Sequence, residues 1–151
     1  MAARYFEDYV PGAVFECGTL VVDEREVIAF ARSYDPQAFH IDPVAAADGP
    51  FGGLIASGWH TIAMTMRVLV ENYLSEASSL GSPGIDELRW QKPVRPGDEL
   101  RVRATILDTK RSRSKPDRGL VRASVEVGNQ HGEQVLTMIA MNLMRLRAPA
   151  A

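Results

Sequence analysis

The sequence predicts an α+β protein in which an antiparallel β-sheet wraps around one long central helix. Helical patterns occupy the first half of the chain, and alternating apolar segments follow residue 80. The longest helical pattern, at 57–74, lies just before that change and is strongly apolar. Because the apolar face of such a sheet needs a cover, we expect the long helix to pack against it. A length of 151 residues fits one domain, taken as 1–151.

The first two helices are predicted from their ends. Asp23 is an N-cap residue in front of an amphipathic segment, and the helix should end at Asp35 because Pro36 disfavours helical geometry in the residue before it. A short second helix should begin after Asp42, with Pro43 in its first position. The end of the first helix and the start of the second therefore border the segment that contains the candidate site.

The third helix spans 57–74, with Ser57 as its cap. Its neighbouring positions are also largely apolar, so we expect this helix to be buried nearly all round. The apolar residues at helical spacing are Ile62, Met66, Leu69, Val70 and Tyr73.

Five strands are predicted, at 13–22, 85–94, 98–109, 120–129 and 134–146. Strict alternation is clearest from Leu100 to Ile106 and from Val121 to Val127. The open edges of such a sheet suit pairing with a second copy, so we expect a homodimer or a higher homo-oligomer.

Composition and charge exclude several classes of protein. Hydrophobic residues make up 46% of the chain and charged residues 24%, with a net charge of -2. This balance is ordinary for a globular protein and favours neither nucleic acid nor an anionic membrane as a partner. Cys17 is the only cysteine, and no apolar run reaches the ~20 residues that a membrane span needs. The N-terminus carries acids where a signal peptide is apolar, so a cytoplasmic location is expected.

Asp35 and His40 are the candidate catalytic residues. They lie five positions apart in a segment that Pro36 and Pro43 stiffen between two helices. A carboxylate and an imidazole held close together are the usual groups of general acid–base catalysis. The spacing alone also fits a structural interpretation, in which Asp35 caps a turn and His40 is a hydrogen-bonded, half-buried ring.

The glycine-rich run FGGLIASG opens the long helix and is the second candidate element. A helix N-terminus presents unpaired backbone N–H groups and a partial positive charge. Gly58 has no side chain, so an oxygen that becomes negative could approach those N–H groups beside Ser57. Alternatively, the glycines only let a loop pass close to a sheet.

The segment from Phe30 to Thr61 resembles the MaoC-like dehydratases, the family of (R)-specific enoyl-CoA hydratases with a hot-dog fold. The family motif D-x-N-P-x-H followed by D-P corresponds to DPQAFHIDP, and its small or histidine–glycine step corresponds to Ser57-Gly58. The later segment LRWQKPVRPGDELRVRATILD is similar as well. Two motif positions differ, with Gln37 in place of Asn and Ala38 in place of Pro. Members also carry a serine two turns into the helix, where this chain has Thr65 and Met66.

The resemblance implies a hydro-lyase of fatty acid metabolism that acts on an acyl-CoA thioester. Asp35 and His40 would handle a water that adds to a trans-2-enoyl thioester, whose carbonyl oxygen would lie at the N–H of Gly58. Trp59 and Met66 would line the acyl pocket, although apolar helix residues are more often core. Coenzyme A would be part of the substrate, and no other cofactor is expected.

Other residues have weaker claims. His60 could face the site but fits a packed position better, and His131 lies in a hairpin turn. The histidines lack metal-ligand spacing, so we expect no metal site. The loop at 110–119 could meet coenzyme A phosphates, but a solvated hairpin is the simpler interpretation. Its five basic residues are Lys110, Arg111, Arg113, Lys115 and Arg118.

Two alternative functions stay open. A hot-dog acyl-CoA thioesterase would share the fold, but such enzymes place an acid or nucleophile on or near the start of the central helix. Here that helix holds only Glu71, with Glu76 just beyond it. A non-catalytic acyl-thioester-binding subunit is the other possibility, and the presence of both Asp35 and His40 argues against it.

Overall fold

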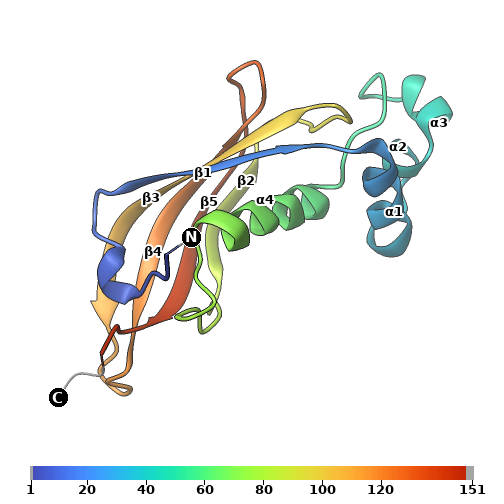
Figure 1. Ribbon diagram of the computed structural model, residues 1–151. Coiled ribbons are helices and arrows are strands. Elements are labelled where there is room, and N and C mark those ends of the chain that lie inside the picture. The colour runs from blue at the N-terminus through green and yellow to red at the C-terminus, as the bar shows by residue number, and fades with distance from the viewer. Residues whose placement is uncertain (1, 149–151) are drawn as a thin grey trace.

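The computed structural model describes residues 2–148 and confirms the predicted arrangement. A five-stranded antiparallel sheet has the strand order β1-β3-β4-β5-β2. In Figure 1, α4 lies along one face of this curved sheet, and α1, α2 and α3 group beyond one end of it. The strands are β1 (Val14–Val21), β2 (Ile85–Trp90), β3 (Glu99–Arg111), β4 (Arg118–Gly128) and β5 (Gln134–Arg145).

The strands follow the predicted alternation. The residues from Leu100 to Ile106 and from Val121 to Val127 alternate between buried and outward-facing positions, and the inward ones form the core under α4. β2 ends at Trp90 rather than at the predicted Val94. Pro93 lacks the N–H that the ladder needs, so the chain leaves the sheet there and runs toward the start of α4.

Local capping sets the helices where the sequence predicted them. α1 (Glu24–Tyr34) begins where Asp23 accepts hydrogen bonds from two backbone N–H groups, and it ends with Asp35 as C-cap. Asp42 caps α3 (Pro43–Ala47) in the same way. The sequence did not predict the single turn α2 (Ala38–Ile41) or the 3₁₀ turn η1 (Phe6–Asp8). α2 matters for function because it carries His40.

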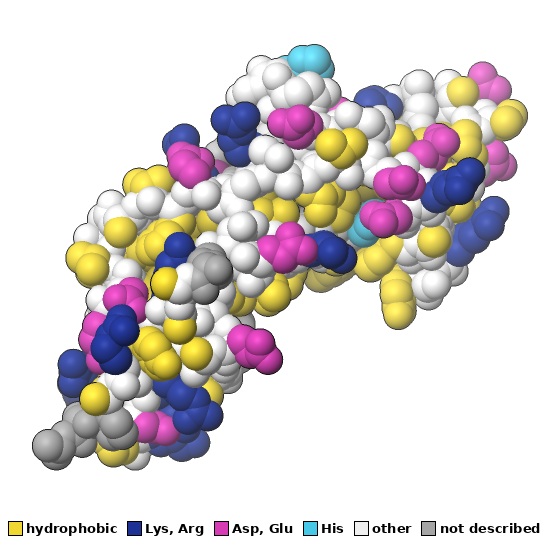
Figure 2. Space-filling model, viewed as in Figure 1, with side chains coloured by type: hydrophobic (Ala, Val, Ile, Leu, Met, Phe, Trp, Pro, Cys, Tyr) yellow, Lys and Arg dark blue, Asp and Glu magenta, His cyan; other side chains and the backbone are white. Residues whose placement is uncertain are grey.

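α4 (Gly58–Asn72) begins directly after its N-cap Ser57, as expected, but the prediction that it is buried nearly all round is wrong. Met64, Val68 and Leu69 are buried, whereas Trp59 and Val70 are 61% and 54% exposed. The sheet of a single chain covers only one side of the helix. Figure 2 shows hydrophobic side chains open to solvent along α4.

Within residues 2–148, no helix is long and apolar enough to cross a membrane. The longest, α4, has 15 residues, fewer than the ~20 of a spanning helix.

Candidate active site

A cavity of about 400 Å³ lies where α4 begins, between α2 and the chain that leaves β2. Its walls come from segments that are far apart in the sequence. The Ala56 N–H donates to the Val94 carbonyl oxygen across 2.8 Å, and this hydrogen bond joins the two sides. The lining residues are Asp35, His40, Phe51, Ile55, Ala56, Gly58, Trp59, Thr61, Trp90, Gln91, Lys92, Pro93 and Val94.

His40 is buried and contacts an acceptor through each ring nitrogen. Its Nδ1 lies 2.7 Å from the carbonyl oxygen of Ile55. Its Nε2 lies 3.2 Å from the Oδ2 atom of Asp35. A carbonyl oxygen and a carboxylate only accept, so the ring satisfies both contacts when both nitrogens carry a proton. The ring is thus held between a backbone carbonyl oxygen and the Asp35 carboxylate.

Asp35 is the other member of this pair, and its side chain is 19% exposed at the cavity wall. Gln37 donates to Oδ1 at 2.7 Å, and the Ser57 hydroxyl donates to Oδ2 at 2.8 Å. The hydrogen bond from Gln37, together with those from Ser57 and His40 and the charge of His40, lowers the pKa of Asp35 below its usual value. Asp35 is thus kept ionised beside the ring.

Ser57 connects this pair to the start of α4. Its hydroxyl oxygen accepts the Trp59 N–H at 3.3 Å, which is the N-cap bond, while the same hydroxyl donates to Asp35. Among the described residues, the Gly58 N–H has no acceptor. The cavity thus combines an acid–base pair with a free N–H at the positive end of a helix.

Trp90 is a neighbour of Gly58 that the sequence did not reveal. Its indole N–H donates to the Gly58 carbonyl oxygen at 2.9 Å. A β-carbon placed on Gly58 would lie 2.6 Å from the Trp90 ring, so a larger residue fits there only if the indole moves. Trp59 contacts Trp90 edge to face, with ring centroids 5.6 Å apart. Trp90 comes from β2, and no local signal links it to the helix start.

The structure brings most of the predicted site residues together. Asp35, His40, Gly58 and Trp59 line the cavity, and Ser57 lies directly behind it. Met66 does not line the cavity, because it faces outward two turns into α4 and is 45% exposed. Phe51, Trp90 and Lys92 line the cavity but were not singled out from the sequence.

The other candidates lie away from the cavity. His60 is buried and stacks on Phe30 with ring centroids 4.8 Å apart, as a packed histidine would. His131 is exposed in the turn between β4 and β5. Residues 2–148 contain no group of three or more His, Cys, Asp or Glu side chains arranged to hold a metal ion. Cys17 is buried, and its burial raises the pKa of the thiol to about 11.

The basic loop forms the turn between β3 and β4. Figure 1 places this turn at the end of the sheet opposite α1–α3, so within one chain it is remote from the cavity. Arg118 pairs with Asp117 at 2.9 Å. The other four basic residues are exposed, as a solvated hairpin requires: Lys110, Arg111, Arg113 and Lys115.

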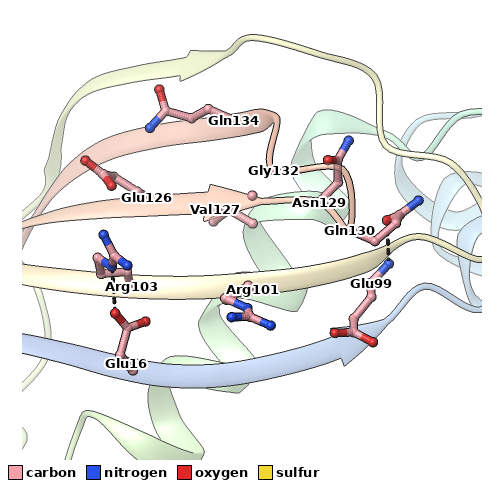
Figure 3. Close-up of a pocket in the computed structure, with 11 residues that line it drawn as sticks. Glu16, Glu99, Arg101, Arg103, Glu126, Val127, Asn129, Gln130, Gly132 and Gln134 are labelled. Carbon is pink, nitrogen blue, oxygen red and sulfur yellow. Dashed lines mark hydrogen bonds and ion pairs between the residues drawn. The ribbon is translucent and has the colours of Figure 1, made fainter.

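A second concavity of about 500 Å³ lies on the outer face of the sheet (Figure 3). Arg103 lies beside Glu16 on one strand and Glu126 on the other, and it forms a 2.8 Å ion pair with Glu16. Such cross-strand pairs are typical of a solvated sheet face. The lining of this surface includes no histidine, cysteine or hydroxyl side chain, so it offers no comparable chemistry.

This chain is similar to a known protein family and to several known proteins. Residues 9–129 match the family model described as a MaoC like domain. The 3-hydroxyacyl-thioester dehydratase Z of Mycobacterium tuberculosis H37Rv is 30% identical over 110 residues, covering 72% of this chain and 73% of that protein. The uncharacterized protein YdeM of Bacillus subtilis is 30% identical over 109 residues, covering 72% and 77%.

Solved structures extend the similarity to nearly the whole chain. The MaoC-like dehydratase from Rhodospirillum rubrum has a TM-score of 0.88 and 40% identity, covering 97% of this chain and 99% of that one. The R-hydratase PhaJ1 from Pseudomonas aeruginosa has a TM-score of 0.76 and 27% identity, covering 97% and 88%. The predicted hot-dog fold is thereby confirmed.

Proposed function

This chain belongs to the MaoC-like dehydratase family, and from that membership we propose that it adds water to a trans-2-enoyl-CoA thioester or removes it in reverse. The observation that carries the proposal is the 3.2 Å contact between His40 and Asp35 inside a cavity that begins at the N-terminus of α4. The dehydratase and hydratase relatives support the reaction class.

In the proposed hydration, Asp35 is the base and His40 the acid. The Asp35 carboxylate takes a proton from water as the water oxygen attacks the β-carbon. The electron pair of the carbon–carbon double bond moves to the bond between the α-carbon and the carbonyl carbon, and the carbonyl pair moves to the thioester oxygen, which gives an enolate. The His40 Nε2–H then protonates the α-carbon. The proton on Asp35 returns to His40 across their contact, which restores the resting pair.

The N–H of Gly58 is proposed to stabilise the enolate oxygen. Charge on that oxygen grows only as water adds, so a donor at the positive end of α4 favours the transition state over the ground state. Trp59 is proposed to contact the acyl chain, since it lines the cavity. Coenzyme A is part of the substrate, and the scheme uses no further cofactor.

A thioesterase is the weaker proposal. Glu71 pairs with Arg67 at 2.9 Å on the exposed face of α4, outside the cavity, and Glu76 does not line the cavity either. No carboxylate on the central helix is therefore placed to act on the thioester carbonyl. The proposed setting is the cytoplasm, with the protein acting as a homodimer.

Incubation with crotonyl-CoA tests the proposal. Enoyl absorbance and free thiol are followed in the same sample. Loss of absorbance without release of thiol is the expected result. Thiol release would identify a thioesterase, and a protein that binds crotonyl-CoA but changes neither signal would be a binding subunit. Hexanoyl-CoA, which has no double bond, serves as the control substrate for hydrolysis alone.

A further inference from the structure

Gln37 contacts both members of the acid–base pair. Its backbone N–H donates to the Asp35 carbonyl at 2.8 Å, and its own carbonyl accepts the His40 N–H at 2.9 Å. Its side-chain amide donates to the Asp35 Oδ1 atom at 2.7 Å. One residue thus connects the end of α1 to the start of α2.

The direction of the Gln37 side chain is informative because the residue is the N-cap of α2. An N-cap side chain usually satisfies the free N–H groups of its helix. Gln37 makes no such bond, and its amide is turned back to Asp35 instead. The side chain therefore serves the carboxylate and not the helix that it precedes.

The two oxygens of Asp35 have different neighbours. Oδ2 faces His40 and the Ser57 hydroxyl, whereas Oδ1 meets Gln37. The terminal torsion of an aspartate is broad, so bonds to one oxygen alone leave the carboxylate plane free to turn. A donor on the second oxygen fixes the plane in which Oδ2 addresses the His40 ring.

We propose that Gln37 is a positioning residue, which fixes the Asp35 carboxylate against His40 for the proton transfers of the proposed hydration. The expected effect of Gln37 on turnover rests on the proposed function, whereas its expected effect on the Asp35 carboxylate does not. The hydrogen bond from Gln37 is also the largest cause of the lowered pKa of Asp35. Loss of this donor should therefore raise that pKa.

Two variants and one matched control test the proposal. Gln37→Leu removes the donor at an exposed position, and Gln37→Glu keeps the shape but puts a carboxylate against Oδ1. Gln130→Leu is the control, because the Gln130 amide donates to Asp98 at 2.9 Å in a turn outside the cavity. The Asp35 carboxyl is titrated by ¹³C NMR in each protein, and kcat and KM are measured with crotonyl-CoA.

Both Gln37 variants should titrate Asp35 at higher pH than the wild type, with Gln37→Glu moving it further. Turnover should fall about tenfold, the worth of one hydrogen bond to a charged group, with KM nearly unchanged. An unshifted Asp35 titration in Gln37→Leu would overturn the proposal, and so would an equal shift in Gln130→Leu. A wild type without turnover refutes the proposed function, while the NMR titration still decides whether Gln37 holds Asp35.

Discussion

Asp35 and His40 meet in one contact but are held by different means. Three side chains bond the Asp35 carboxylate, whereas His40 is buried and fixed through a backbone carbonyl on its far nitrogen. Two groups that act together on one water should lose function as a unit when either is removed.

We therefore expect non-additive losses from Asp35→Asn and His40→Gln. Each change should lower turnover of crotonyl-CoA about 100- to 10,000-fold, the usual worth of a general acid–base group. The double variant should be little worse than the poorer single one. Binding of a saturated acyl-CoA should be nearly unchanged in all three, and His131→Gln, in a distant turn, should retain full turnover. More than about a tenth of wild-type activity in either single variant would make the pair structural.

His60 predicts an acid-sensitive stability. The ring is buried against Phe30, and its Nδ1 atom has no partner among the described residues. Burial lowers the pKa of His60 below its ordinary value, although Glu26 opposes the shift. The pKa of His60 is therefore higher in the unfolded chain, about 6.5, than in the folded protein. Below that pH the unfolded chain binds a proton at His60 more readily than the folded protein does, so the free energy of unfolding should fall as the pH drops.

Comparing urea unfolding of wild type and His60→Leu between about pH 7 and pH 5 isolates this effect. The variant should lose less stability over that interval, because leucine keeps the packing but binds no proton. His131→Leu, at an exposed position, should follow the wild type. Parallel pH curves for wild type and His60→Leu would show that His60 does not resist protonation.

At the scale of elements, what the sequence predicted is what local chemistry determines. The caps Asp23, Asp42 and Ser57 act within three residues of their own positions, so their helices begin as predicted. The sequence did not predict the single-turn helix α2, because four residues are too few to show a helical periodicity. The sequence also did not predict the exposed side of α4, since an apolar helix pattern does not show which of its residues the sheet of one chain will cover.

The same distinction applies to the cavity. Asp35, His40, Ser57 and Gly58 all lie in one continuous stretch, where their spacing could be seen directly. Trp90 comes from a strand 32 residues beyond Gly58 and reaches it only when β2 folds against the sheet. Its role at the helix start is a product of tertiary packing.

Gly58→Val tests the start of α4. The added side chain would enter the space beneath the Trp90 indole, where even a β-carbon lies 2.6 Å from the ring. We expect at least a ~100-fold loss of turnover with crotonyl-CoA, in line with the loss of one oxyanion donor, in a protein that still folds. Circular dichroism checks the fold.

The double variant Gly58→Val with Trp90→Ala separates two causes of that loss. Trp90→Ala alone removes the indole and serves as the baseline. If valine blocks the approach to the N–H, the double variant stays at least ~100-fold below that baseline. Activity equal to the baseline would mean that valine acts only by displacing Trp90, and the oxyanion site would have to be placed elsewhere.

At the scale of the whole molecule, one side of α4 and the edge strand β2 are largely exposed within residues 2–148. Trp59, Met66 and Val70 form an exposed apolar stripe along α4, and Ile85 and Trp90 on β2 are 45% and 44% exposed. Stripes of this kind mark interaction surfaces. A second copy related by a two-fold axis would meet the same surface and cover both.

The homodimer prediction follows from this surface. Light scattering at micromolar concentration should give about twice the 16.6 kDa mass of one chain. Val70→Glu places a charge within the exposed stripe and should shift the protein toward monomer. Val44→Glu makes the same change on α3, where Val44 is 79% exposed and away from the stripe, and should leave the dimer intact. A wild type of 16.6 kDa would contradict the prediction, and a dimer unaffected by Val70→Glu would move the interface away from α4.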